Sequence, residues 1–288
     1  MYSKQEQYLI IVKIKGGEII MFKETKNYNK LFVVNVFAVF WLSILLTGLV
    51  LMLMGEKAPM QLMTTICAWT PTIVLLIMFN KLLPNTTRRE YFKNLFREKI
   101  KWTMVFFVTF IQLLIVLISA YTLSLLEKTP LLSLLNLSIP ILSQLFFVSL
   151  TTGATGEESA WRGYLFPVIK EKSGVIKGSL LLGLIWFFWH VPLYIATSGF
   201  MGTELVIYLS MSLLLIVSTS VIICVCYEYN RNLFIPIWIH LMVNFSFGIV
   251  AVNLENAITF VAYITILYIV TAFGFYLWYK KFNKEVVL

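Results

Sequence analysis

Residues 205–227, LVIYLSMSLLLIVSTSVIICVCY, form an uncharged stretch of 23 residues that determines the fold class. An α-helix needs about 20 residues, at a rise of about 1.5 Å each, to cross the roughly 30 Å hydrocarbon core of a bilayer. The stretch is long enough for such a helix, and it lacks the short alternating segments that are typical of transmembrane strands. It therefore predicts a membrane-spanning helix.

Seven further stretches without Asp, Glu, Lys or Arg are 23 to 28 residues long. The whole chain is 59% hydrophobic and only 13% charged, whereas soluble domains have roughly 45–50% apolar and about 25% charged residues. The composition excludes a soluble fold and predicts an all-α, polytopic bundle of about eight transmembrane helices. The eight stretches are 31–55, 58–80, 102–126, 129–156, 178–203, 205–227, 232–254 and 256–279.

The positions of the basic residues predict the orientation of the bundle. With the N-terminus inside, the cytoplasmic segments hold 20 of the 23 Lys and Arg residues, and only Lys57 and Lys128 lie in outside connections. Because cytoplasmic loops are enriched in Lys and Arg, both termini are predicted to be cytoplasmic. The net charge of +9 is thus spread over loops on one side, and no nucleic-acid partner is expected.

One basic loop, residues 85–101, has a pattern of its own. Six Lys and Arg residues are interspersed with Tyr91, Phe92, Leu95, Phe96 and Ile100, whose spacing places them on one helical face. This pattern predicts a short interfacial helix on an anionic leaflet, with a solvated loop as the alternative.

The N-terminal region lacks the features of a cleaved signal sequence, because residues 1–20 contain no apolar core of that type. The string KGGE at 15–18 can be encoded by AAA-GGA-GGA-GAA, which is similar to a ribosome-binding site just upstream of Met21. We therefore hypothesise that translation begins at Met21, and the nucleotide sequence of the gene would test this.

Three charged side chains, Glu157, Glu158 and Arg162, lie in TTGATGEESAWRGYLFPVI (151–169), with apolar sequence on both sides. Burying a charged side chain in hydrocarbon costs about 2.5–3.5 kcal/mol, so such residues indicate function. Glu158 and Arg162 are four residues apart and share a helix face, which predicts an ion pair. Glu157 is rotated by roughly 100° from its neighbour and is left available for chemistry.

Both histidines of the chain, His190 and His240, also lie within predicted spans, and Asn244 follows His240 by about one helical turn. Counted from the cytoplasmic ends of their helices, Glu157 lies about 18 Å deep and His190 about 20 Å deep. His240 and Asn244 lie at about 10 and 17 Å. Three helices therefore bring polar groups to similar depth, as a functional site requires.

These residue types indicate hydrolysis of an amide by an activated water. A carboxylate beside a histidine can remove a proton from water, and a second histidine with an amide nitrogen can stabilise an oxyanion. The chain has no Asp for a Ser-His-Asp triad, its cysteines lie outside the short sequences that carry these polar residues, and the usual two-histidine zinc signatures are absent. A proton-coupled transporter is the alternative, although no internal repeat is evident.

Three short motifs occur in order within roughly residues 138–250, one on each of three predicted helices. They are EESAWR (157–162), WFFWH (186–190) and HLMVN (240–244). They resemble the E-E-x-x-x-R, F-x-x-x-H and H-x-x-x-[N/D] motifs of the CPBP (ABI) intramembrane proteases. That family includes type II CAAX prenyl endopeptidases and lysostaphin-resistance-protein-A-like proteins, and its structurally known CAAX-processing member has a similar count of eight helices.

The resemblance implies a role for each matching residue. Glu157 would be the general base that activates water together with His190. His240 and Asn244 would form the oxyanion hole. The implied activity is that of a membrane-embedded, glutamate-type endopeptidase acting near the cytoplasmic side.

Supporting roles and a metal alternative follow from the same resemblance. Glu158 and Arg162 would shape and neutralise the site. The family is often labelled metalloprotease, and in that version Zn²⁺ would be held by Glu157, His190 and His240. No cofactor is expected, because His240 and its neighbouring amide suit an oxyanion hole better than a second ligand pair.

The expected partners are the lipid bilayer and a membrane-associated peptide or protein substrate. A prenylated C-terminal peptide and a leader or bacteriocin-related peptide are both candidates, and family members also include inactive bacteriocin-immunity or regulatory proteins. The composition, which lacks Asp, is typical of an AT-rich bacterial genome, so a bacterial cell membrane is expected. Trp186 departs from the usual Phe of the second motif, and its larger ring is expected to narrow the substrate channel.

Four regions are predicted along the chain. The first is a cytoplasmic segment, and the second holds the N-terminal transmembrane helices with the interfacial segment 85–101. The third is the protease-like catalytic core, and the fourth is the last transmembrane helix with a cytoplasmic tail. Their bounds are 1–30, 31–126, 129–255 and 256–288.

Overall fold

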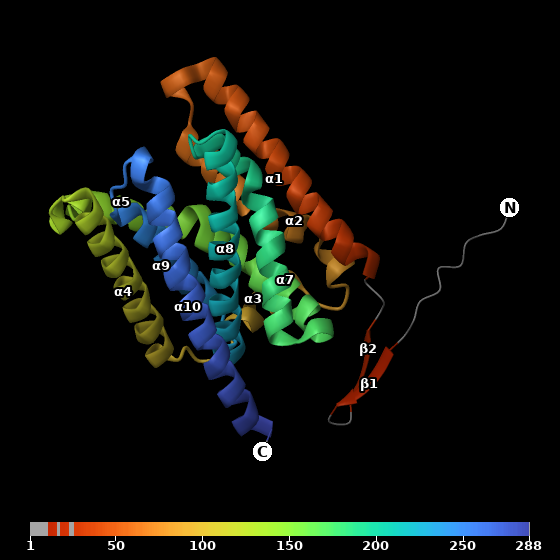
Figure 1. Ribbon diagram of the computed structural model, residues 1–288. Coiled ribbons are helices and arrows are strands. Elements are labelled where there is room, and N and C mark those ends of the chain that lie inside the picture. The colour runs from red at the N-terminus through yellow and green to blue at the C-terminus, as the bar shows by residue number, and fades with distance from the viewer. Residues whose placement is uncertain (1–10, 16–17, 23–25, 288) are drawn as a thin grey trace.

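The computed structural model describes the backbone of residues 11–15, 18–22 and 26–287, and the side chains of residues 28–281 (Figure 1). Strands β1 (Ile11–Lys15) and β2 (Glu18–Phe22) pair as an antiparallel hairpin, with Ile11 opposite Phe22. The predicted all-α fold did not include this hairpin. From Lys26 onward the described chain is mainly helical, as predicted. Of the predicted cytoplasmic segment 1–30, residues 1–10, 16–17 and 23–25 lie outside the described residues.

Ten α-helices form the bundle in the part of the chain that the structure describes. Short turns of 3-10 helix, Gly55–Lys57 and Leu131–Leu134, and of π-helix, Leu150–Ala154 and Trp161–Leu165, lie between some of them. The helices are α1 (Lys26–Met54), α2 (Met60–Leu82), α3 (Arg88–Leu95), α4 (Trp102–Glu127), α5 (Ile139–Ser149), α6 (Thr155–Ala160), α7 (Phe166–Thr197), α8 (Gly202–Asn230), α9 (Phe234–Ile249) and α10 (Leu254–Val287).

Six helical stretches among the described residues are long and apolar enough to cross a membrane, so the chain is a multi-pass integral membrane protein. One of them, Ile139–Thr197, is 59 residues long and combines α5, α6, α7 and the two π-turns. It is interrupted at Gly174, whose φ of 75° and ψ of 171° are not helical. Only a residue without Cβ adopts such a conformation readily.

The interruption at Gly174 reverses the chain. Gly178 approaches Lys170 so closely that a Cβ on Gly178 would lie 3.1 Å from the Lys170 Cα. The stretch therefore consists of two helices that meet near the predicted cytoplasmic segment 170–177. The count of eight predicted spans is reached only when these halves are separate and α9, with 16 residues, is included as a short span.

The connections between helices gather at two opposite ends of the bundle (Figure 1). At one end, Asn230 joins the α3–α4 connection through its contacts with the Lys101 N–H, at 2.7 Å, and the Lys99 carbonyl, at 2.9 Å. The Leu233 N–H donates to the Leu95 carbonyl at the same end. Because Lys99, Lys101 and Lys170 all lie at this end, we call it the basic end. At the other end, the Asn136 N–H donates to the Ile249 carbonyl at 2.8 Å.

Helix α3 lies at the basic end and begins with a capping box. The Thr87 hydroxyl accepts from the Glu90 N–H, and the Glu90 carboxylate accepts from the Thr87 N–H at 2.9 Å. These hydrogen bonds lower the pKa of Glu90, since they favour its charged form. The predicted helix is confirmed only for Arg88–Leu95, which is shorter than the predicted segment.

The apolar face of α3 packs on protein rather than facing lipid alone. Tyr91 and Leu95 are buried, and a Cβ on Gly163 would lie 2.7 Å from the Tyr91 hydroxyl oxygen. That hydroxyl donates to the Ser159 carbonyl at 2.6 Å, and burial raises the pKa of Tyr91. Helix α3 is thereby attached directly to the segment that carries Glu157 and Glu158.

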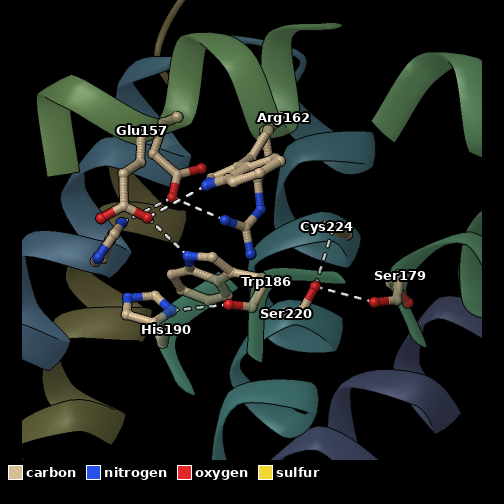
Figure 2. Close-up of polar contacts among 10 residues, drawn as sticks. Glu157, Arg162, Ser179, Trp186, His190, Ser220 and Cys224 are labelled. Atoms are coloured by element: carbon tan, nitrogen blue, oxygen red, sulfur yellow. Dashed lines mark hydrogen bonds and ion pairs between the residues drawn. The ribbon is translucent and has the colours of Figure 1, made fainter. Parts of the chain in front are cut away.

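Helix α8 is the central helix, and most of its apolar residues are buried. It packs against α7 through small residues: a Cβ on Gly183 would lie 2.9 Å from the Val217 Cα, and Ser220 donates to the Ser179 carbonyl at 2.9 Å (Figure 2). Small residues allow close helix approach in membranes, where van der Waals packing drives association. This contact fixes the helix that carries His190.

Candidate active site

The segment that carries the two glutamates is irregular, because π-turns precede and follow the short helix α6. The Thr155 hydroxyl donates to the Leu150 carbonyl, five residues back, at 2.7 Å. Such wide turns are frequent at functional sites because they re-aim the residues beside them. Gly156 allows close packing here, since a Cβ would lie 2.7 Å from Trp69 Cδ1.

Glu158 is the centre of a buried polar group. Its Oε1 accepts from Arg162 Nη1 at 2.9 Å and from His240 Nδ1 at 2.8 Å. The three side chains are at most 4% exposed, and the predicted ion pair between Glu158 and Arg162 is present. The Arg162 guanidinium also lies 4.3 Å from the centre of the Trp186 ring. Because a carboxylate oxygen only accepts, His240 uses Nδ1–H here and directs Nε2 elsewhere.

Glu157 is held by two tryptophans. Its Oε2 accepts from Trp186 Nε1 at 2.6 Å and from Trp161 Nε1 at 3.2 Å. The other oxygen, Oε1, faces Gly153, where a Cβ would lie 3.5 Å away. Oε2 thus orients the carboxylate through its hydrogen bonds, while Oε1 is directed to the space that a side chain at position 153 would fill.

His190 is oriented by the backbone of its own helix. Its Nδ1 lies 2.8 Å from the Trp186 carbonyl and must donate to it, which leaves Nε2 with a lone pair. The ring stacks on Tyr194, with centroids 5.5 Å apart and planes 12° apart. Figure 2 shows both contacts of Trp186, the indole N–H with Glu157 and the backbone carbonyl with His190.

The four predicted catalytic residues line one cavity of about 360 Å³. Glu157 comes from α6, His190 from α7, and His240 and Asn244 from α9. The rest of its wall is largely apolar and includes side chains from α1 and α2, which lie outside the three motifs. These wall residues include Phe40, Ile44, Cys67, Ala68, Val148 and Leu193.

Gly153 is a site residue that sequence reasoning missed. A Cβ there would lie 2.7 Å from Asn244 Nδ2, 3.2 Å from His240 Nε2 and 3.5 Å from Glu157 Oε1. The three functional atoms therefore surround one small space that exists because residue 153 has no side chain. Its signal in the sequence is a glycine four residues before Glu157, one helical turn away.

Trp186 does not have the predicted effect on the substrate channel. The described residues that line the cavity do not include it, and it is 3% exposed. The larger ring lies behind the cavity, where its N–H orients Glu157. A phenylalanine could not make this hydrogen bond. The departure from the usual motif therefore adds a donor that orients the Glu157 carboxylate.

The alternative ligand set for a zinc ion is Glu157, His190 and His240. Among the residues that the structure describes, no three His, Cys, Asp or Glu side chains are grouped as metal ligands. The Nδ1 atoms of both histidines contact other partners, so only their Nε2 atoms are directed to the cavity. No chemical step is therefore assigned to a metal below.

The chain is thus a polytopic membrane helix bundle with a cavity lined by glutamate and histidine side chains. Residues 138–246 match the sequence model of the family described as type II CAAX prenyl endopeptidase Rce1-like. CAAX prenyl protease 2 from Methanococcus maripaludis is 23% identical to this chain over 197 residues, which cover 65% of this chain and 72% of the relative. The chain belongs to the Rce1-like type II CAAX prenyl endopeptidase (CPBP) family.

Proposed function

We propose that the protein is an intramembrane endopeptidase that hydrolyses a peptide bond of a membrane-associated peptide or protein with an activated water. The observation that carries this proposal is the convergence of Glu157 Oε1, His240 Nε2 and Asn244 Nδ2 around the Gly153 position. His190 lines the same cavity. Family membership supports the reaction class, since its name describes an endopeptidase.

In the proposed first step, the water is bound between Glu157 Oε1 and the lone pair of His190 Nε2. Glu157 removes a proton while the water oxygen forms a bond to the scissile carbonyl carbon. The carbonyl oxygen gains the electron pair of the C=O double bond and becomes an oxyanion. When the C–N bond breaks, the proton on Glu157 is transferred to the departing nitrogen.

The oxyanion is stabilised by the side chains of α9. Asn244 Nδ2 can donate directly, whereas His240 Nε2 donates only if it carries a proton in addition to the one on Nδ1. His240 therefore acts as an imidazolium, held by Glu158 at 2.8 Å. The positive charges of His240 and Arg162 then balance the negative charges of the Glu157 and Glu158 carboxylates. This balance limits the free-energy cost of burying charge.

We further propose eight membrane crossings with both termini in the cytoplasm. The basic end would face the cytoplasm, because cytoplasmic loops are rich in Lys and Arg. Residues 139–173 and 175–197 would cross separately, and α9 would be a short span of about 24 Å by helical rise. We also propose that the cavity is reached from the cytoplasmic side of a bacterial cell membrane.

The apolar cavity wall supports a substrate with an apolar segment beside the scissile bond. The relative from Methanococcus maripaludis is named a CAAX prenyl protease, and a prenylated C-terminal peptide is accordingly one candidate substrate. A leader or bacteriocin-related peptide is the other. Both candidates have apolar segments that match Phe40, Ile44 and Leu193.

Comparative proteomics of membrane peptides tests the proposal. Cells that produce the unaltered protein are expected to contain cleaved peptides that are absent with Glu157→Gln. Glu171→Gln, an exposed change of the same kind outside the cavity, is the matched control and should restore cleavage. Identical peptide patterns for Glu157→Gln and the unaltered protein would contradict the mechanism.

Metal analysis of the purified protein tests the metal-free version separately. We expect no stoichiometric zinc and no loss of cleavage after chelation. Zinc at one per chain, with activity lost on its removal and restored on its return, would overturn this version and favour a zinc site formed by Glu157, His190 and His240.

A further inference from the structure

Two adjoining cavities at the basic end lie apart from the active site. The first, which we call the acyl groove, runs between α4 and α10 and has a volume of about 630 Å³. The second, which we call the basic recess, is formed by the α3–α4 connection and the end of α8. Tyr229 lines both, so the two cavities meet at this residue.

The acyl groove is apolar and faces the lipid side of the bundle. Met104 and Phe275 are buried in its floor, while Phe107 is 52% exposed at its edge. Gly274 has open space where a Cβ would be, so the groove exists partly because this residue has no side chain. From Thr103 to Ile111 the groove extends roughly 12 Å along α4 by helical rise, enough for the first half of an acyl chain.

The basic recess is positively charged. Four basic side chains, Arg97, Lys99, Lys101 and Arg231, line it together with only two carboxylates. The carboxylate of Glu98 pairs with Arg97, and that of Glu228 pairs with Arg231 and Lys170. Among the described residues, no carboxylate forms an ion pair with Lys99 or Lys101.

Lys101 marks the junction between the two cavities. Its Nζ lies 3.6 Å from the centre of the Tyr229 ring and 3.1 Å from the Tyr229 carbonyl oxygen. The ammonium group is therefore fixed by two neutral contacts at the point where the apolar groove becomes polar. An amphiphile with its chain in the groove would place an anionic headgroup beside this charge.

We propose that the acyl groove and the basic recess bind one anionic phospholipid, with the first half of an acyl chain along α4 and α10 and the phosphate beside Lys99 and Lys101. The unpaired positive charge selects an anionic headgroup over a zwitterionic one. The bound lipid packs on the side of the bundle away from the Glu157 cavity, so this site is independent of the proposed function.

Native mass spectrometry of the full-length protein in detergent tests this proposal with added phosphatidylglycerol or phosphatidylcholine. The unaltered protein is expected to retain one phosphatidylglycerol in preference to phosphatidylcholine. Because a lysine near an anionic lipid contributes about fivefold in binding, Lys99→Gln with Lys101→Gln should lower the preference by roughly 25-fold. An unchanged preference in this double variant would overturn the proposal.

Gly274→Phe tests the groove, since its ring would occupy the space of the acyl chain. Retention of phosphatidylglycerol is expected to fall about tenfold or more. Gly48→Phe is the matched control, because Gly48 also has open space around its Cβ position and lies in α1, away from the groove. Equal retention by Gly274→Phe and Gly48→Phe would overturn the proposal.

Photocrosslinking of the unaltered protein provides a measurement that needs no variant. Phosphatidylglycerol with a diazirine in the first half of an acyl chain is expected to label residues 104–111 and 271–278. Labelling spread evenly over the exposed faces of α1 and α4 would show general lipid contact and overturn the site.

Discussion

A single methyl group at position 153 is expected to remove nearly all catalysis. In Gly153→Ala the new carbon would lie 2.7 Å from Asn244 Nδ2, 3.2 Å from His240 Nε2 and 3.5 Å from Glu157 Oε1. The first distance is shorter than any real Cβ contact, so the amide must move. The methyl group would also fill the space that the proposed water and oxyanion need.

The size of the effect follows from the groups displaced. Losing one oxyanion donor costs about 10²–10³ in kcat, so kcat should fall by at least that factor. Stability should change less, because alanine favours a helix by roughly 0.5–1 kcal/mol over glycine while overpacking costs about 1–3 kcal/mol. The protein should therefore fold and remain inactive.

The assay is cleavage of a membrane peptide by purified protein, with thermal unfolding measured in parallel. Gly48→Ala is the matched control, because no heavy atom lies within 4 Å of its Cβ position. It should leave kcat unchanged. If Gly153→Ala were as active as this control, the reacting atoms could not meet beside residue 153, and the proposed geometry would be refuted.

Three further outcomes are expected. Glu158→Gln should lower the free energy of unfolding by about 3–5 kcal/mol, since it leaves a buried guanidinium without its carboxylate; an unchanged unfolding temperature would contradict this. Trp186→Phe removes the indole donor to Glu157 and should lower kcat about 10- to 100-fold with little change in KM, and a change in KM alone would indicate a channel role instead. Because the pKa of Glu90 is lowered in the fold, its cap on α3 should be complete above the ordinary glutamate pKa and lost as the pH falls through the lowered value. Thermal unfolding against pH should show this loss in the unaltered protein and not in Glu90→Gln.

Much of the bundle is predictable from the sequence, because lipid makes long uncharged runs a strong signal. The residues at which the helices begin and end are less predictable. The run 129–156 ends at Glu157, yet the helical stretch continues past it through two π-turns to the reversal at Gly174. A charged residue shows where burial in lipid is costly. It does not show where the backbone hydrogen bonds of a helix end.

Other features required tertiary information. The amphipathic pattern of 85–101 predicts an apolar face but does not specify what covers it, and Tyr91 packs on Gly163. The N-terminal hairpin had a local signal, two runs rich in Ile flanking Gly16 and Gly17, which is typical of a tight hairpin.

The candidate site, too, was predictable from the sequence only in part. Glu157, His190, His240 and Asn244 are polar groups within apolar sequence, which made them predictable, and the structure places all four in one cavity. Tryptophan and glycine are common in apolar sequence and were not predicted as site residues on this basis. Neither the indole donors that orient Glu157 nor the missing side chain of Gly153 carries charge, so neither stands out from an apolar background.

Glu157 is proposed to activate the water that cleaves a peptide bond, and this role is tested by cleavage of a membrane peptide by purified protein in lipid vesicles. Mass spectrometry would detect the new termini, with ¹⁸O-labelled water marking the new carboxylate. Labelled product is expected from the unaltered protein and from Glu171→Gln, and none above background is expected from folded Glu157→Gln. Labelled product from folded Glu157→Gln at the rate of the unaltered protein would contradict this role.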